Sequence, residues 1–294
     1  MEIFGVATQA LFGQLLIGLI NGSFYALLSL GLAVIFGLLN IINFTHGAQY
    51  MMGAFCAYFL LTKLGIGYWW ALAIVPLAVG FVGMVIERLM LSKLYQLDHL
   101  YGLLLTFGLA LIIQGLFRHA YGTSGEPYAV PQELSGGRNL GFMFLPNYRA
   151  WVIVASLVVC LATWFVIEKT KLGSYLRAAT ENPALVQAFG INVPRMITLT
   201  YGFGVALAAF AGVMAAPIYQ VNPLMGADLI IVVFAVVVIG GMGSIMGSIV
   251  TGFALGLIEG LTKVFYPEAS NTVIFIIMAI VLMIKPAGLF GTQR

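Results

Sequence analysis

Charge is what this sequence has least of. Of its 294 residues, 13 are Lys or Arg and 10 are Asp or Glu, so charged residues make up only 8% of the chain, against about 25% in typical soluble domains. Hydrophobic residues make up 62%. A soluble protein of this composition could not cover its apolar surface, whereas a lipid bilayer requires no such covering. The composition therefore predicts a protein that crosses the bilayer several times.

Further absences exclude several classes of function. The net charge of +3 arises without a basic cluster, so the chain lacks the electrostatic surface of a nucleic-acid-binding protein. Its two cysteines, Cys56 and Cys160, lack the spacing of a metal site or a disulfide. We find no G-x-S-x-G, no H-E-x-x-H and no acidic pair deep in an apolar run, so we expect neither an enzyme nor a metal site. The P-loop pattern G-x-x-x-x-G-K-[ST] is also missing, so an ATPase that drives this protein must be a separate chain.

Charged residues indicate where the chain leaves the bilayer, because one charge at its centre costs about 2.5 to 3.5 kcal/mol. No charge occurs between Ile3 and Thr62, a run long enough for two spans of about 20 residues and a connection at membrane depth. Further candidate spans cover residues 68–91, 100–117, 150–167, 196–219, 229–241, 248–261 and 271–285. We therefore expect a single all-α transmembrane domain over residues 1–294, a helical bundle with about nine spans (roughly 8 to 10) and broken or re-entrant helices.

The basic residues of the connections set the orientation. With the N-terminus outside, most of them fall on the cytoplasmic side, and the cluster between Ile167 and Met196 is the strongest local signal. We therefore expect a cytoplasmic segment at residues 169–195 and an ordered extracytoplasmic loop, rich in Gly and Pro, at residues 122–148. No basic residue precedes the first apolar run, so we expect the first span to be retained rather than cleaved as a signal peptide.

Small residues recur at every fourth position in two of the expected spans. Helices in lipid associate through close packing, which small residues permit because they let two backbones approach. Both spans are therefore expected to face protein, either inside the bundle or at a seam with a second subunit. The two stripes consist of Gly204, Ala208, Gly212 and Ala216, and of Ser244, Ser248, Gly252, Gly256 and Gly260.

Polar side chains gather within the first charge-free run, at residues 40–49. Unpaired polar groups cost several kcal/mol each in hydrocarbon, so this segment must face protein or a water-filled cavity. A broken helix or a turn at membrane depth that lines a pathway is the preferred interpretation. The alternative is a short cytoplasmic turn in which the histidine is a hydrogen-bonded structural residue. The candidate pathway residues are Asn40, Asn43, Phe44, His46 and Gln49.

The expected cytoplasmic segment contains signals for a short helix. Asn182 suits the N-cap, Pro183 the first helical position and Gly190 the residue after the C-terminus, which predicts a helix of about two turns. Leu185, Ala188 and Phe189 would share one face of this helix. Such an apolar face among basic residues indicates either docking into a groove of a partner or a helix that lies flat on the membrane.

Several longer motifs follow one another along the chain. Ile42-Asn43-Phe44-Thr45-His46-Gly47 is followed by Gly190-Ile191-Asn192, Ala208-Ala209-Phe210-Ala211-Gly212-Val213, Gly240-Gly241-Met242-Gly243-Ser244-Ile245-Met246-Gly247 and Lys285-Pro286-Ala287-Gly288-Leu289-Phe290-Gly291. In these motifs and in their order the chain resembles the permease subunits of ABC importers for branched-chain amino acids. It departs from that family at Thr45, where alanine is usual, and from the coupling pattern of many other importers at Pro183, where that pattern has glycine.

The resemblance implies a multi-pass protein of a bacterial inner membrane, with its N-terminus in the periplasm. The implied partners are a second homologous permease, two cytoplasmic P-loop ATPases that hold the ATP and magnesium, and a periplasmic solute-binding protein; this chain itself would bind no cofactor. By the same resemblance, residues 43–49 would line or gate the translocation route. The implied coupling residues are Arg177, Glu181, Asn182, Leu185, Phe189 and Gly190.

Other transport functions stay open at this point. An ion-coupled secondary transporter would work without an ATPase, but it usually needs ionisable groups near the middle of the membrane, and only Asp228 and Glu259 are candidates. Among ABC importers, urea or short amides, aromatic acids and sugars are alternative substrates, because the binding protein sets much of the selectivity.

Overall fold

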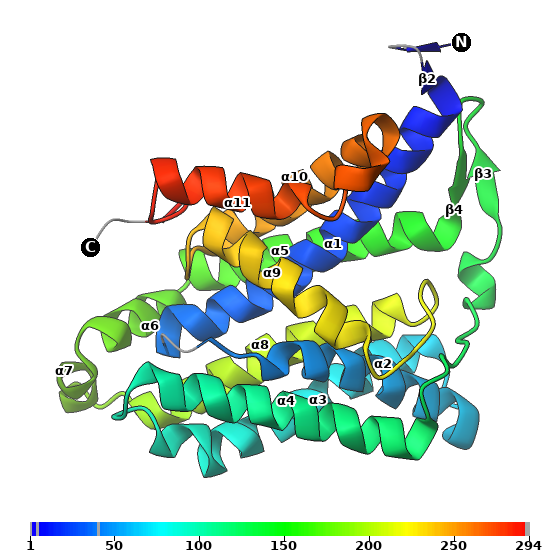
Figure 1. Cartoon of the computed structure of the whole chain (residues 1–294). Coiled ribbons are helices and arrows are strands. Elements are labelled where there is room, and N and C mark those ends of the chain that lie inside the picture. Colours follow the sequence, from blue (N-terminus) through cyan, green and yellow to red (C-terminus); the bar gives the residue numbers. More distant parts are fainter. Residues whose placement is uncertain (1, 4–5, 40–41, 292–294) are drawn as a thin grey trace.

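The computed structural model describes residues 2–3, 6–39 and 42–291 and forms a bundle of helices (Figure 1). The α-helices are α1 (Thr8–Leu39), α2 (Thr45–Leu64), α3 (Tyr68–Leu89), α4 (His99–Tyr121), α5 (Asn147–Lys169), α6 (Lys171–Glu181), α7 (Pro183–Ala188), α8 (Val193–Ala215), α9 (Met225–Gly240), α10 (Ile245–Phe265) and α11 (Val273–Ile284). Two antiparallel strand pairs are present: β1 (Glu2–Ile3) pairs with β2 (Val6–Ala7), and β3 (Gly137–Asn139) pairs with β4 (Phe144–Pro146). Short 3-10 turns occupy Leu91–Lys93, Gln132–Leu134 and Pro267–Ala269.

Six helices in the described part of the chain are long and apolar enough to cross a bilayer, namely α1, α3, α4, α5, α8 and α10. This agrees with a helical protein that crosses the membrane several times. The expected count of about nine spans is not confirmed. Two further apolar helices, α9 and α11, have 16 and 12 residues, and at about 1.5 Å per residue both are shorter than the roughly 30 Å hydrocarbon core.

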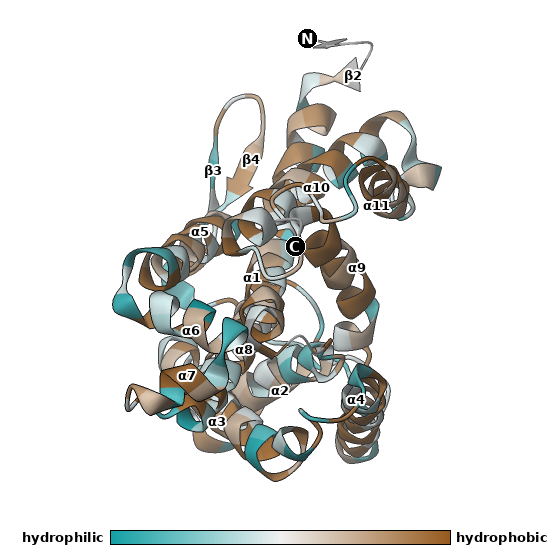
Figure 2. Cartoon of the chain, turned by 90° about the vertical axis from the view of Figure 1, so that its left-hand side faces the viewer, coloured by the Kyte–Doolittle hydropathy of each residue, from teal (hydrophilic) through white to brown (hydrophobic). Residues whose placement is uncertain are grey.

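The two ends of the bundle differ in character. Helices α6 and α7 lie at one end, whereas the β3–β4 hairpin lies at the opposite end (Figure 1). Viewed from the end that carries α7, the hydrophilic segments gather around α6, α7 and the first turns of α8, while α9 and α11 are strongly hydrophobic (Figure 2). The expected polar segments at residues 122–148 and 169–195 therefore lie at different ends.

Helix α1 forms the centre of the bundle and packs against α10 through backbone contact. In the apolar windows of the spanning helices, 83% of the α1 residues are buried but only 11% of the α4 residues. A Cβ atom at Gly252 would lie 2.6 Å from the Cα of Ala26, and one at Gly256 would overlap the backbone of Gly22. A Cβ at Gly260 would lie 2.5 Å from the carbonyl oxygen of Gln14. This part of the small-residue stripe thus faces α1 of the same chain.

The remaining predicted packing residues also make their contacts within the same chain. A Cβ at Gly204 would lie 2.8 Å from the carbonyl oxygen of Gly31 on α1, and one at Gly212 would lie 2.9 Å from the backbone nitrogen of Ala54 on α2. Ser244 caps α10, because its Oγ accepts a hydrogen bond from Gly247 N at 3.1 Å. The carbonyl of Ser248 accepts a hydrogen bond from Ser29 of α1 at 3.2 Å. These contacts make α1, α2, α8 and α10 the packed interior.

Candidate functional site

The predicted polar segment lies in the interior between α1 and α2. Asn40 is outside the described residues. Residues 42–44 are not helical, and α2 begins at Thr45. Asn43, His46 and Gln49 are at most 1% exposed, so they do not lie on the surface of this chain. His46 Nε2 donates a hydrogen bond to the carbonyl of Leu28 at 3.0 Å, which is the structural role that the alternative interpretation assigned to it.

Thr106 of α4 holds the non-helical residues in place. Its hydroxyl donates to the carbonyl of Ile42 at 3.1 Å and accepts from Phe44 N at 3.3 Å, while its own carbonyl accepts from Thr45 Oγ1 at 2.8 Å. Sequence reasoning did not identify Thr106 as a site residue, because a single threonine within an apolar span forms no recognisable pattern.

Three buried polar atoms of the segment have no hydrogen-bond partner among the described residues: Asn43 Nδ2, His46 Nδ1 and Gln49 Oε1. A buried polar atom without a partner costs about 1–3 kcal/mol, and native proteins carry few of them. Three of them within the short segment at residues 43–49 are therefore unusual. Phe44 instead lines a small cavity of about 80 Å³ between α2, α4 and α9.

A larger cavity of about 290 Å³ opens between α1, α2, α9 and the connection from α8 to α9. Polar and apolar side chains share its wall, which includes Asn21, Phe24, Tyr25, Tyr219, Asn222, Met225 and Asp228. Asp228 is exposed on the first turn of α9, whereas Glu259 of α10 is only 5% exposed. The two acidic residues singled out from the sequence therefore differ in environment, and only Asp228 lines this cavity.

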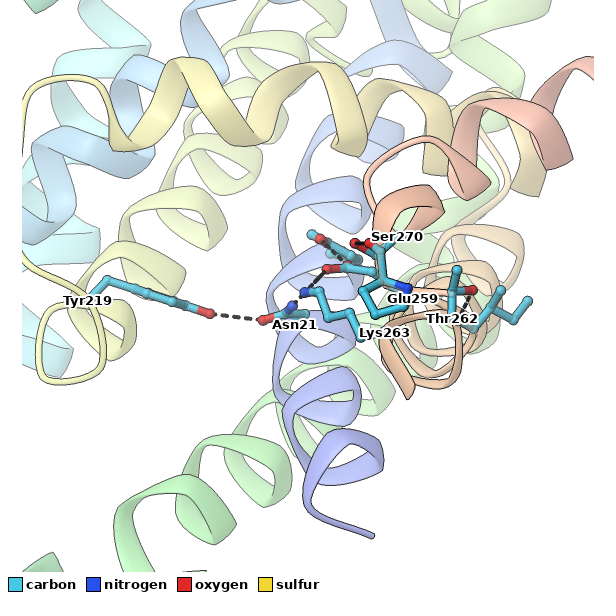
Figure 3. Close-up of polar contacts among 9 residues, drawn as sticks. Asn21, Tyr219, Glu259, Thr262, Lys263 and Ser270 are labelled. Carbon is cyan, nitrogen blue, oxygen red and sulfur yellow. Dashed lines mark hydrogen bonds and ion pairs between the residues drawn. The ribbon is translucent and has the colours of Figure 1, made fainter. Parts of the chain in front are cut away.

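A chain of hydrogen bonds joins the cavity wall to Glu259 (Figure 3). Tyr219 OH donates to Asn21 Oδ1 at 2.9 Å, and Asn21 Nδ2 donates to Glu259 Oε1 at 3.3 Å. Tyr25 OH donates to Glu259 Oε2 at 2.6 Å, and Lys263 forms an ion pair with Oε1. The buried carboxylate is thus paired and fully hydrogen-bonded.

A third acidic residue, Glu87 of α3, is buried at 1% exposure. Its carboxylate accepts hydrogen bonds from Tyr95 OH at 2.5 Å and from Thr198 Oγ1 of α8 at 2.6 Å. Sequence reasoning missed this site, since Glu87 precedes Arg88 and the pair has the pattern of a span end. Among the described residues, no group of three or more His, Cys, Asp or Glu could hold a metal ion.

The segment after α5 forms two short helices, α6 and α7. Asn182 Oδ1 accepts a hydrogen bond from Leu185 N at 3.0 Å, and Gly190 has a φ of +84°, so both caps act at the predicted positions. Leu185 and Phe189 are 54% and 78% exposed. The opposite face of α7 is anchored by Val186, which is buried with Ala179 and Val193. Arg177 and Glu181 are exposed on α6, and Arg177 pairs with Glu168 at 3.4 Å.

Comparison with known proteins supports one family. The family described as "Branched-chain amino acid transport system / permease component" matches residues 14–282. The permease protein LivH of the high-affinity branched-chain amino acid transport system of Escherichia coli (strain K12) is 30% identical over 95% of this chain and 94% of its own length.

Two further relatives carry similar names. The permease protein BraD of Pseudomonas aeruginosa is 29% identical over 95% of both chains. The permease protein LivM of Escherichia coli (strain K12) is 27% identical over 92% of this chain and 68% of its own length. No solved structure matches the chain. On the match over residues 14–282 and the identity to LivH, the chain belongs to the family of branched-chain amino acid transport system permease components.

Proposed function

We propose that this chain is the transmembrane permease subunit of an ATP-driven, binding-protein-dependent importer for branched-chain amino acids or related small polar solutes. The similarity to LivH over 95% of the chain carries the proposal. The similarity to LivM supports a partnership with a second, homologous permease. ATP and magnesium would bind to separate ATPase subunits, so this chain has no catalytic role, and a solute-binding protein would deliver the substrate.

The proposed arrangement has nine crossings and a periplasmic N-terminus. Every expected span contains a helix: the six long apolar helices are joined by α2, which has 20 residues, and by α9 and α11, which would cross as short helices within the assembled complex. The end with α6 and α7 would face the cytoplasm, because it carries the basic residues of the segment 169–195. The β3–β4 hairpin would then face the periplasm, where the binding protein docks.

The proposed route begins at the cavity beside Asp228 and continues past the polar segment at residues 42–49. In the cavity, the carboxylate of Asp228 attracts the ammonium group of an amino acid, while Phe24 and Met225 contact its apolar side chain. Deeper in the bundle, the unpartnered polar atoms of Asn43, His46 and Gln49 become available to water or solute when the helices separate. The second permease would close the other side of this route.

Helix α7 is the proposed coupling helix. Leu185 and Phe189 are the exposed apolar residues that would enter a groove of the ATPase, and Val186 links the helix to the start of α8. A displacement of α7 by the ATPase would thereby reach α8, which packs against α1, α2 and α3.

Transport by the reconstituted complex tests the proposal. The tagged chain is purified with its co-purifying subunits, which are identified by mass spectrometry, and placed in proteoliposomes with the binding protein and labelled leucine. We expect ATP-dependent uptake that unlabelled isoleucine and valine inhibit and that urea and benzoate do not. A complex with an inactivated ATPase is the control. Uptake by the chain alone, driven by an ion gradient, would instead identify an ion-coupled carrier.

A further inference from the structure

A basic cavity of about 550 Å³ lies where α3 ends and α8 begins, at the end of the bundle that carries α7. Its wall contains Arg88, Asn192, Arg195, Thr198 and Leu199. Both arginines are exposed, and neither forms an ion pair within the described part of the chain. Two unpaired guanidinium groups around one cavity offer the forked donor geometry that matches phosphate oxygens.

Glu87, the acidic residue next to Arg88 in the sequence, forms no ion pair with the arginines of this cavity. Glu87 is 1% exposed, and its two oxygens accept hydrogen bonds from Tyr95 and Thr198. Arg195 lies in the first turn of α8, whose N-cap is Asn192, so the positive end of the helix dipole adds to the two charges. The cavity therefore favours an anion.

An apolar cavity of about 230 Å³ adjoins the basic one. The two share Leu199, and the wall of the apolar cavity also includes Val34, Ile167, Leu172, Leu176 and Phe203. Arg195, Leu199 and Phe203 follow one another at every fourth position, so they form one exposed face of α8. Along this face the surface changes from a cationic end to a hydrocarbon-like slot between α8, α5 and α6.

We infer that the two cavities together bind an anionic phospholipid of the membrane leaflet on the α7 side. Its phosphate lies between Arg88 and Arg195, and one acyl chain passes Leu199 into the apolar cavity. Basic pockets between helices at the membrane surface are suited to such head groups. A free phosphate ion has no acyl chain, so it could bind only in the basic cavity and would not account for the adjoining apolar cavity. The inference requires that the chain is inserted in a bilayer and does not depend on the transported solute.

Lipid retention by the purified complex tests this inference. The full chain with its co-purifying subunits is mixed with phosphatidylglycerol or phosphatidylcholine of the same acyl chains, and bound lipid is measured by native mass spectrometry. We expect preferential retention of phosphatidylglycerol. The double substitution Arg88→Gln/Arg195→Gln should weaken it about 30-fold, because each basic residue at a membrane surface contributes roughly a five- to sixfold gain in affinity. Arg118→Gln/Arg138→Gln, which removes two exposed arginines elsewhere, should leave it unchanged.

A second variant separates lipid from free phosphate. Leu172→Trp fills the apolar cavity from an exposed position without altering charge, so it should weaken phosphatidylglycerol binding and leave binding of inorganic phosphate unchanged. The inference is wrong if the arginine variant retains the lipid like the wild type, or if Leu172→Trp has no effect while phosphate competes fully. It is also wrong if only the isolated chain binds the lipid, because the cavity would then be covered by a partner subunit. Thermal unfolding like that of the wild type confirms that each variant is folded.

Discussion

At the scale of single residues, buried polar groups carry most of the information about function. Glu259, Glu87 and the polar residues Asn43, His46 and Gln49 are all buried where helices contact one another. Burial of such groups stabilises the protein only where each has a partner. A buried charge or polar atom without a partner loses its hydrogen bonds to water and gains none in return. The partners of these residues therefore define positions at which a conservative substitution has a measurable effect.

The ion pair in α10 leads to the first prediction. Lys263→Met should lower the free energy of unfolding by about 1–3 kcal/mol, because it leaves the buried carboxylate of Glu259 without its cation. Adding Glu259→Gln should restore most of the loss. Thermal unfolding in detergent measures both effects. The control is Lys93→Met, at an exposed lysine that forms no ion pair with any described residue. Equal stability of the single variant and the wild type would show that the pair contributes nothing.

Thr106 leads to the second prediction. Thr106→Val keeps the shape of the side chain but removes the hydroxyl that binds Ile42 and Phe44, so unfolding should become easier by about 1–3 kcal/mol. Uptake should fall as well, if residues 42–44 must hold their non-helical shape. Thr262→Val is a matched control, since among the described residues the hydroxyl of Thr262 bonds only to Ile258 within its own helix. A Thr106 variant as stable as that control would contradict the role of Thr106.

At the scale of elements, the contact between α1 and α10 depends on the absence of side chains. Gly252, Gly256 and Gly260 of α10 meet glycine, alanine and backbone atoms of α1, so the two helices approach more closely than larger residues would allow. The sequence of one helix shows its own small residues, but it does not show which residues of the other helix they contact. The partner helix lies more than two hundred residues away in the chain.

Gly256→Leu should therefore disrupt folding, because its side chain would occupy the backbone position of Gly22. Overpacking of a well-packed core costs about 1–3 kcal/mol or more, and we expect low yield and aggregation in gel filtration. Gly115→Leu on α4 is the matched control, since nothing lies within 4 Å of a Cβ at that position. Monodisperse, active protein from Gly256→Leu would contradict the close contact of α1 and α10.

The short helix α7 leads to a prediction on assembly. Leu185→Asp/Phe189→Asp should abolish both ATPase association and uptake while the chain still inserts and folds, because these side chains are exposed and contribute little to the core. Leu140→Asp/Phe144→Asp alters two exposed apolar residues near the β3–β4 hairpin and should leave association intact. Co-purification of the subunits is the measurement. If the ATPase still co-purifies with the Leu185→Asp/Phe189→Asp variant, α7 is not the coupling helix.

At the scale of the whole molecule, the bundle has one end with α6 and α7 and another with β3 and β4 (Figure 1). The orientation of these ends can be measured directly. In a variant with Cys56→Ala and Cys160→Ala, a cysteine introduced by Gln187→Cys should react with an impermeant thiol reagent only from the cytoplasmic side. One introduced by Leu140→Cys should react only from the periplasmic side. Reaction of both from the same side would contradict the proposed topology.

Much of the membrane organisation follows from the sequence, because its causes are local. A scarcity of charge identifies a membrane protein wherever the helices finally pack, and the spacing of charges locates the apolar segments that become helices. Asn182, Pro183 and Gly190 cap α7 through contacts within a few residues, so the position of this helix was predictable from the chain alone. The six long apolar helices confirm a multi-pass helical protein.

Which surfaces meet was decided only by the tertiary structure. The sequence shows a stripe of small residues, but periodicity within one helix does not encode its partner, and only the fold places Gly256 against Gly22. Likewise, Glu87 has the sequence context of a span end, yet Thr198 and Tyr95 bury it. The sequence by itself determined that the chain is a multi-pass membrane protein and where the short helix α7 begins and ends, because composition and capping act locally. The fold decided which polar groups are paired, because their partners are distant in the chain.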